Sequence, residues 1–395
     1  MADDVTRAPK QELGQELSRE LVQELPLSLR EGVGGRGTYD HGPRPYAPLP
    51  PTPPLKGRGS PCSGFRRILL ACATSLLLYT VIFGAILDRP LSYGFLRDAI
   101  DARLARGATI AGPKLVILAG SNGPYSHRCA TIEPLLRTPC VNAGVAVGIG
   151  LDYLFARWEP LLHPGDVVYL PMEEAQYVRD RAATALGPDA AIMLRHDRAT
   201  LAELPPQRWV GALFVYDLRG ALMALIETGL AAGGFHDPRA ATVGESNDWG
   251  DHIGHTAALA AASASVLAAA EPFHPSAAQI RTGYGSALIA RFAEWARAHG
   301  VRVIGGLPTG FADSPITDDA VAAIRAIYTT HGALFLELPN RSRYPREAFF
   351  DTAEHLNESW QVVHSVAVAR GLVEVMPSQR PPTGLAMGPP PAALP

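Results

Sequence analysis

The sequence predicts an α/β protein in which a parallel sheet lies between two layers of helices, behind a single transmembrane helix. Two observations predict this class. Short apolar segments alternate with helical patterns from 114 to 370, and twenty consecutive residues at 68–87 carry no charge. With 395 residues, of which 47% are apolar, the chain can build a substantial core.

The predicted strands are short and apolar. They lie at 114–119, 140–142, 166–170, 301–305 and 333–336. The predicted helices lie at 130–136, 150–162, 284–299, 318–331 and 358–370. Parallel strands need long crossovers, which helices supply, so this alternation predicts a parallel sheet. Five such strands suit a flavodoxin-like order and a three-layer α/β/α architecture.

Residues 180–280 interrupt the alternation. Two Ala-rich helical stretches, 214–232 and 256–270, flank the polar loop GFHDPRAATVGESNDWGDHIGH. We expect a helical insertion over an edge of the sheet.

The apolar run at 68–87 predicts a membrane anchor, with bounds of about 66–88. A helix of this length spans about 30 Å, which matches the hydrocarbon core of a bilayer. Four Lys and Arg residues at 56–67 precede the run without a nearby acid, whereas acidic residues follow it. The positive-inside rule therefore predicts a cytoplasmic N-terminus and a periplasmic domain at 89–375, anchored in a bacterial inner membrane. A cleaved signal peptide fits less well, because the run is long and lies far from the start of the chain.

The two ends of the chain are predicted to be disordered tails. Within the cytoplasmic residues 1–65, the QEL repeats at 11–26 place four leucines on one side of an amphipathic helix. This helix is either a transient low-complexity segment or a docking site for a partner. Gly and Pro enrichment at 32–61 predicts a tether, and residues 376–395 form a Pro-rich tail.

Two of the four cysteines fall in the exported part. Cys129 and Cys140 would meet an oxidising compartment, where a disulfide and a pair of buried thiols are both open. Cys62 and Cys72 lie before and within the predicted span. The net charge of -3, with no basic stretch that interleaves with aromatics, excludes a nucleic-acid partner.

Ser121 follows the first predicted strand, in a small-residue turn. Ligands of open parallel sheets bind beyond the carboxyl ends of the strands, so the position suits a nucleophile. Gly120 permits a tight turn, and the next helix can direct N–H groups at an oxyanion.

The segment FFDTAEHLNESW pairs Asp351 with His355, and Asn357 is the predicted N-cap of the last helix. A serine nucleophile needs a base, and a histidine base needs an acceptor that fixes its tautomer. The chain order Ser, Asp, His therefore predicts nucleophilic catalysis. The alternative is that Asp351 is a turn residue and His355 a surface imidazole.

Four runs together resemble an SGNH (GDSL-type) hydrolase domain over roughly residues 110–372: LVILAGSNG, PCVNAGVAVGIG, LHPGDVVYLPMEE and DTAEHLN. They are more closely similar to the membrane-anchored SGNH-like proteins that accompany exopolysaccharide synthesis and acylation. The resemblance implies that Ser121 is the nucleophile, His355 the base and Asp351 its acid. It also implies an oxyanion hole formed by the N–H groups of Ser121 and Gly144.

Two departures from the family pattern stand out. Pro171-Met172-Glu173-Glu174 replaces the usual Gly-x-Asn-Asp, which removes an oxyanion asparagine that Asn122 can replace. Asp351 and His355 are four apart rather than three, with Glu354 between them. Glu173 or Glu174 can bind sugar hydroxyls; the alternative for both is a solvated strand end.

The insertion loop carries Asp248, Asp251, His252 and His255. His-x-x-His beside carboxylates can bind a divalent metal, but the spacing is unspecific. We favour a loop that lines the mouth of the serine site, with Trp249 stacking on a sugar. No metal and no cofactor are expected.

The site residues and the apolar run predict an anchored, exported serine enzyme. The resemblance implies an esterase or O-acyltransferase that acts on an exopolysaccharide, of which cellulose is one example. Its expected partners are a carbohydrate polymer or acylated glycan, the inner membrane, and a polysaccharide synthase or membrane acyltransferase. The alternative is a non-catalytic accessory subunit that binds glycan outside and docks a synthase component through the QEL helix. An esterase of small molecules or lipids ranks last, because no G-x-S-x-G elbow is present.

Overall fold

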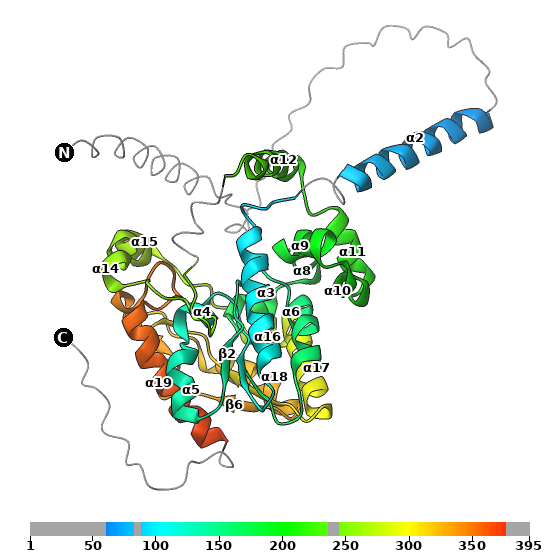
Figure 1. Ribbon diagram of the computed structural model, residues 1–395. Coiled ribbons are helices and arrows are strands. Elements are labelled where there is room, and N and C mark those ends of the chain that lie inside the picture. The colour runs from blue at the N-terminus through cyan, green and yellow to red at the C-terminus, as the bar shows by residue number, and fades with distance from the viewer. Residues whose placement is uncertain (1–60, 83–87, 236–244, 377–395) are drawn as a thin grey trace, which may run out of the picture. The chain divides into compact units, whose positions relative to one another are not determined.

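The computed structural model describes residues 61–82, 88–235 and 245–376 (Figure 1). The QEL helix, the tether, the Pro-rich tail and part of the insertion loop lie outside these residues. The chain divides into two compact units, Met1–Ser75 and Leu76–Pro395, and the α/β domain belongs to the second.

Helix α2 (Pro61–Val81) corresponds to the predicted anchor. Its stretch Gly64–Val81 has a mean hydropathy of 1.3, is long enough to cross a membrane, and is not buried. The helix begins five residues before the predicted bound at 66, and residues 83–87 lie outside the described residues.

Five parallel strands form the central sheet in the order β2-β1-β3-β4-β6. They are β1 (Leu115–Ile117), β2 (Cys140–Asn142), β3 (Val167–Leu170), β4 (Arg302–Gly306) and β6 (Leu334–Leu336). Each predicted strand is confirmed, and all neighbours pair in parallel. The order is the flavodoxin-like one, because β5 lies outside this sheet.

Helices cover both faces of the sheet (Figure 1). One face carries α5 (Cys129–Leu136) and α19 (Glu358–Val375), and the other carries α3 (Gly94–Thr109), α6 (Leu151–Trp158), α17 (Tyr284–Ala298) and α18 (Asp318–Thr330). Strand β1 shows how the sequence builds these layers. Its Leu115 and Ile117 pack in the hydrophobic core under α5 and α19, whereas Val116 packs in the core on the opposite face of the sheet. A strand buried on both faces needs an unbroken apolar run, which is the pattern that predicted it.

Helix α3 was not predicted. Charged residues interleave with its apolar ones and hide the pattern. However, Leu96, Ile100 and Leu104 recur every four residues and are buried against the sheet. That spacing was the available signal.

The insertion is more helical than expected. It follows α7 (Glu174–Val178) and contains α8 (Arg181–Ala185), α9 (Pro188–His196), α10 (Arg198–Glu203), α11 (Pro206–Leu213), α12 (Leu218–Ala232), α14 (Ala257–Ala260) and α15 (Ala264–Ala269), with α16 (Ala277–Thr282) at its end. The helix predicted at 214–232 begins at Leu218, because the Asp217 side chain caps it by accepting the N–H of Gly220 (2.6 Å). The stretch predicted at 256–270 is divided by a 3-10 turn between α14 and α15.

A second, two-stranded parallel sheet was also not predicted. It pairs β5 (Gly310–Phe311) with β7 (Arg343–Tyr344). Strands of two residues are too short to leave a period in the sequence.

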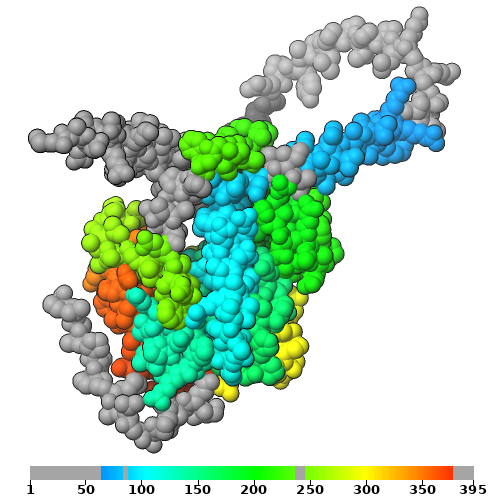
Figure 2. All heavy atoms as spheres, viewed as in Figure 1, coloured from blue at the N-terminus to red at the C-terminus, as the bar shows by residue number. Residues whose placement is uncertain are grey.

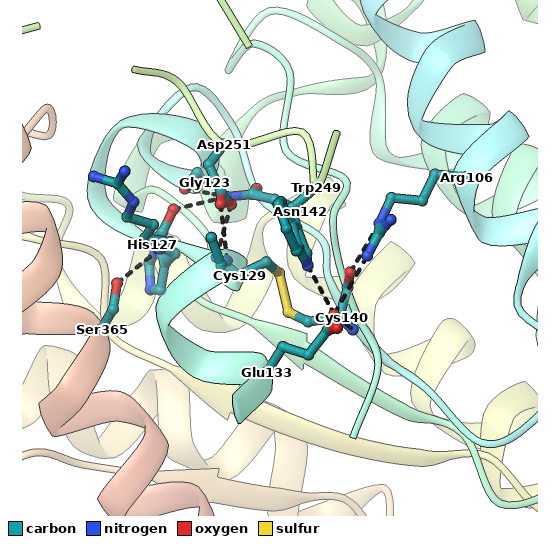
Figure 3. The surroundings of a disulfide bond; sticks show 12 residues. Arg106, Gly123, His127, Cys129, Glu133, Cys140, Asn142, Trp249, Asp251 and Ser365 are labelled. Carbon is teal, nitrogen blue, oxygen red and sulfur yellow. Dashed lines mark hydrogen bonds and ion pairs between the residues drawn. A yellow bond between two sulfur atoms is a disulfide. The ribbon is translucent and has the colours of Figure 1, made fainter. Parts of the chain in front are cut away.

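A disulfide joins Cys129, at the start of α5, to Cys140 in β2 (Figure 3). It resolves the choice between a bridge and two thiols. Asp251 of the insertion loop accepts the N–H groups of Cys129 (2.7 Å) and Ala130 (3.0 Å), so the start of α5 is held covalently and by a remote cap.

We expect loss of this disulfide to lower the free energy of unfolding by about 2–4 kcal/mol, because the bridge restricts the unfolded chain. Thermal unfolding of the full chain with and without reductant measures the effect. A Cys72→Ser variant keeps the bridge and serves as the control. Equal midpoints for the oxidised and reduced protein would contradict this expectation.

Candidate active site

Ser121 lies at the carboxyl edge of the sheet, between β1 and the short helix α4 (Asn122–Ser126). Its hydroxyl donates a hydrogen bond to Glu173 Oε1 (3.3 Å), and the N–H of Asn122 donates to the same oxygen (3.1 Å). Glu173 is only 6% exposed. A buried carboxylate is therefore the immediate partner of the candidate nucleophile.

The strand register explains this pairing. Ile117 of β1 lies opposite Tyr169 of β3 in the parallel ladder. Ser121 and Glu173 are each four residues beyond that pair, so the two chains carry them side by side past the end of the sheet. Glu173 is held there by Gln176, since the two residues form a capping box at the start of α7.

The turns after β1 and β2 pack backbone against backbone. A Cβ at Gly144 would lie 2.7 Å from the carbonyl oxygen of Gly120 and 2.8 Å from the Cα of Gly123. Glycine is therefore required at this contact. Gly144, the candidate oxyanion residue, is thus close to the Ser121 turn.

Asp351 and His355 form a direct pair. Asp351 Oδ1 and His355 Nδ1 are 2.7 Å apart, and the His355 side chain is 11% exposed. Asn357 caps α19 by accepting the N–H of Trp360 (3.3 Å), as predicted. The alternative of a surface histidine is wrong, because His355 is buried and its Nδ1 has a carboxylate partner.

Helix α4 links this pair to Ser121. The ring of Tyr125 stacks on the ring of His355 with centroids 4.1 Å apart and planes 9° apart. The hydroxyl of Ser126 donates to the carbonyl oxygen of Glu354 (2.7 Å). The short helix that begins after Ser121 therefore packs directly on the Asp351–His355 segment.

Burial and pairing set the ionisation of the pair. Burial lowers the pKa of His355, but the hydrogen bond and the charge of Asp351 outweigh it and leave that pKa raised. For Asp351 burial raises the pKa, and the same pairing outweighs it and leaves that pKa lowered. The arrangement favours an imidazolium beside a carboxylate, the charge pair that forms when a histidine base takes a proton.

Glu173 has the opposite tendency. Burial, reinforced by the nearby charge of Glu354, raises its pKa to about 7, although the N–H of Asn122 partly offsets the shift. Burial also raises the pKa of Glu354. The Ser121 hydroxyl is therefore hydrogen-bonded to a carboxyl group that changes charge near neutral pH.

In the described part of the chain no hydrogen bond joins Ser121 to His355. Glu173 interacts with both: it accepts from the Ser121 hydroxyl, and its charge raises the pKa of His355. The three predicted catalytic residues thus share one end of the sheet, and Glu173 takes the contact that a base would make with Ser121.

A small cavity of about 40 Å³ adjoins Glu173. Glu174, Arg343, His274 and Glu354 also line it. Glu174 is 8% exposed and forms ion pairs with Arg343 (2.9 Å) and His274 (2.8 Å). Solvated strand ends are therefore excluded for both glutamates, and their role in substrate binding stays a prediction.

Two predicted site residues make other contacts. The Asn122 side-chain amide donates to the carbonyl oxygen of Pro171 (2.8 Å), while its backbone N–H is bound to Glu173. Trp249 lies beside the disulfide, where its indole N–H donates to Glu133 (2.8 Å) and Arg106 lies over its ring (Figure 3). Trp249 is thus grouped with α5 and β2 rather than with Ser121.

Two histidines of the insertion loop do approach the site. His252 and His255 pack on Tyr125, with ring centroids 4.2 and 5.3 Å apart. Burial lowers the pKa of each to about 4, so both are neutral near pH 7. Asp251 instead caps α5. Among the described residues, no three His, Cys, Asp or Glu side chains form a group able to hold a metal ion.

A larger cavity, of about 190 Å³, lies elsewhere, between the insertion and α17. Arg181, Arg208 and Tyr284 line it. Volume alone would favour this cavity as the site. We favour the Ser121 end, because the paired acid, base and hydroxyl lie there.

Two contacts of the site were not predicted: the stacking of Tyr125 on His355 and the ion pair of Arg343 with Glu174. Tyr125 is separated from Ser121 by one helical turn, so a helix in the turn SNGPYS was the available signal. For Arg343 no local pattern exists, because it reaches Glu174 from β7 through tertiary packing. Comparison of the chain with family models, with curated proteins and with solved structures finds no match.

Proposed function

We propose that this chain is a membrane-anchored, exported serine esterase or O-acyltransferase of the SGNH type that acts on an acylated exopolysaccharide. One observation carries the proposal. The hydrogen-bonded Asp351–His355 pair lies at the same end of the sheet as Ser121, against the helix that Ser121 begins. The cellulose family of polymers is suggested by the resemblance in the sequence.

The proposed reaction has two steps. Ser121 Oγ attacks the ester carbonyl, and His355 Nε2 takes its proton, because Nδ1 is bound to Asp351. The sugar oxygen leaves with that proton, and an acyl-serine remains. Water then releases the acid, or a hydroxyl of another sugar accepts the acyl group. Before the attack the Ser121 hydroxyl must leave Glu173 and turn to His355.

The proposal places this domain outside the cytoplasm. Its support is the apolar helix α2, the basic residues that precede it, and the disulfide between Cys129 and Cys140. We expect the membrane to be the inner membrane of a bacterium.

The direct test uses the full chain in lipid nanodiscs. Turnover of a chromogenic acetyl ester and release of acetate from acetylated cello-oligosaccharides are measured, with a non-acetylated acceptor added to detect transfer. We expect turnover of at least one ester. Absence of both hydrolysis and transfer, in a protein with an intact disulfide, would contradict the proposal.

We expect Asp351→Asn to lower turnover by about 10²–10⁴-fold, since the amide cannot hold His355 in the tautomer of a base. Loss of the carboxylate also lowers the pKa of His355, so the acid limb of the pH profile should move to lower pH. Asp319→Asn, at an exposed residue of α18, is the control. An unchanged acid limb would argue against a positioning role for Asp351.

A second candidate function is a non-catalytic subunit that binds glycan beside a polysaccharide synthase. The observation that favours it is Glu173, a carboxylate in the place where the resemblance implies an oxyanion asparagine. An ionised carboxylate there repels a developing oxyanion. Glycan binding by a chain that turns over no ester would support this function instead.

A further inference from the structure

Helix α12 exposes a continuous apolar face. Its exposed large residues are Leu218, Leu222, Leu225, Ile226 and Leu230, each between 39% and 89% exposed. Steps of four, three, one and four residues place them on one side of a helix. The opposite side carries the buried Ala224 and Glu227. The apolar face is thus largely exposed, whereas the opposite side packs against the domain.

Glu227 fastens α12 to the segment that follows the predicted anchor. Its carboxylate binds the guanidinium of Arg89 (2.7 Å) and accepts the backbone N–H of Ser92 (2.9 Å). The hydroxyl of Thr228 donates to the carbonyl oxygen of Asp88 (3.1 Å). Figure 2 shows α12, in green, directly against the cyan start of the domain. The glutamate is 4% exposed, so the link is buried.

The segment that Glu227 and Thr228 bind lies close to the end of α2 along the chain. Only the residues from Val81 to Asp88 connect them, and seven fully extended steps reach about 25 Å. A bilayer that α2 crosses therefore passes within about 25 Å of α12.

The dimensions of α12 favour lying on a bilayer over crossing it. Its 15 residues extend about 22 Å, less than the 30 Å of a hydrocarbon core. The preceding α11 does not complete a membrane span with α12. The two helices are bent by 71° at the break between them. Arg208 of α11 is buried in the domain, in ion pairs with Asp189 and Asp152.

We propose that α12 lies in the surface of the bilayer that α2 crosses, with its leucine face among the acyl chains and Glu227 holding it to the domain. A helix with one apolar and one anchored side binds in this way, at a depth of about 5–10 Å in the headgroup region. The domain then has a second, fixed contact with the membrane beside its anchor.

This contact orients the candidate active site. Helix α3 runs antiparallel to the strands. Arg103 donates to the carbonyl oxygen of Asn142 at the carboxyl end of β2, and Arg106 donates to the carbonyl oxygen of Cys140 at the start of β2. The start of α3 at Gly94, two residues after Ser92, therefore lies about 14 Å past Arg103, beyond the carboxyl ends. The membrane-bound α12 thus stands on the side of the sheet where Ser121 lies.

Site-directed spin labelling of the full chain tests the proposal, with one copy per nanodisc of phosphatidylethanolamine and phosphatidylglycerol. In a background of Cys62→Ser and Cys72→Ser, a nitroxide is attached at Leu225→Cys or at Leu334→Cys. Leu334 is the control, a 38% exposed leucine in β6, and Figure 1 shows β6 at the end of the domain away from α12. Collisions with oxygen, which concentrates in lipid, are compared with collisions with a water-soluble nickel chelate.

We expect the ratio of oxygen to nickel collisions at L225C to exceed that at L334C several-fold. Equal ratios, with nickel reaching both sites, would place α12 in water and overturn the proposal. A label at L225C that neither reagent reaches would place the face against protein, and with one copy per nanodisc this too would overturn it. The readout does not depend on ester turnover, so it is independent of the proposed function.

Discussion

Ser121→Ala is expected to lower ester turnover by about 10⁴-fold or more, because the variant keeps the fold and the Asp351–His355 pair but has no oxygen to attack the ester. The attack on the ester is made by Ser121 Oγ alone, so no partial activity through the same route is possible. Turnover of a chromogenic acetyl ester by the full chain in nanodiscs measures the loss.

The matched control is Ser359→Ala, which removes an exposed hydroxyl from the first turn of α19, beside the candidate site in sequence. We expect this variant to keep wild-type turnover. If S121A and S359A were equally active, the nucleophile would have to be another group.

Glu173→Gln is expected to raise turnover at pH 8 by about 10²-fold. In the wild type an ionised carboxylate holds the Ser121 hydroxyl and the N–H of Asn122, where it opposes the charge of an oxyanion. The amide has no charge and can donate a hydrogen bond, and one such donor is worth about 10²–10³ in rate. The substitution restores the type of side chain that the SGNH resemblance implies near this position.

The pH profile separates this effect from a simple change in binding. Wild-type turnover should rise as His355 loses its proton and fall again as Glu173, with a pKa of about 7, becomes ionised. Glu173→Gln should keep the rise and lose the fall. Glu203→Gln, at an exposed residue at the end of α10, is the control for loss of one negative charge. A fall that persists in E173Q would assign the alkaline limb to another group.

The same substitution has a consequence for stability. Burial raises the pKa of Glu173 from its usual 4.5 to about 7, so the folded state holds this proton more tightly than the unfolded chain. Its contribution to stability is complete below pH 4.5 and is lost as the pH rises to about 7. Two and a half pKa units correspond to about 3 kcal/mol, so E173Q should be more stable than the wild type at pH 8 by up to about that amount. Denaturant unfolding at pH 4 and pH 8 measures the difference.

The sheet could be predicted because its strands are buried on both faces. Val116 and Ile117 belong to different cores, and both must be apolar, which leaves an unbroken run in the sequence. Helices α8 to α11 could not be predicted in the same way. They have five to nine residues, which is too few for a helical period, and their starts are marked only by caps such as Asp180 and Asp197.

The contacts of the candidate site also differ in whether a local sequence pattern predicts them. The pairing of Asp351 with His355 is local, four residues apart, and the sequence alone was enough to suggest it. The contact between Ser121 and Glu173 depends on β1 and β3 being neighbours in register, which a reading of either segment alone does not contain. The place of Trp249 also depends on tertiary contacts, because its indole binds Glu133 and stacks with Arg106 beside the disulfide.

Covalent labelling tests whether Ser121 is a nucleophile that His355 activates. The full chain is treated with a fluorophosphonate, which reacts with activated serines, and the modified peptide is identified by mass spectrometry. We expect modification of Ser121, at an unchanged rate in S359A and much more slowly in His355→Gln. No modification of Ser121 in a folded, disulfide-bonded protein, or equal rates with and without His355, would contradict it.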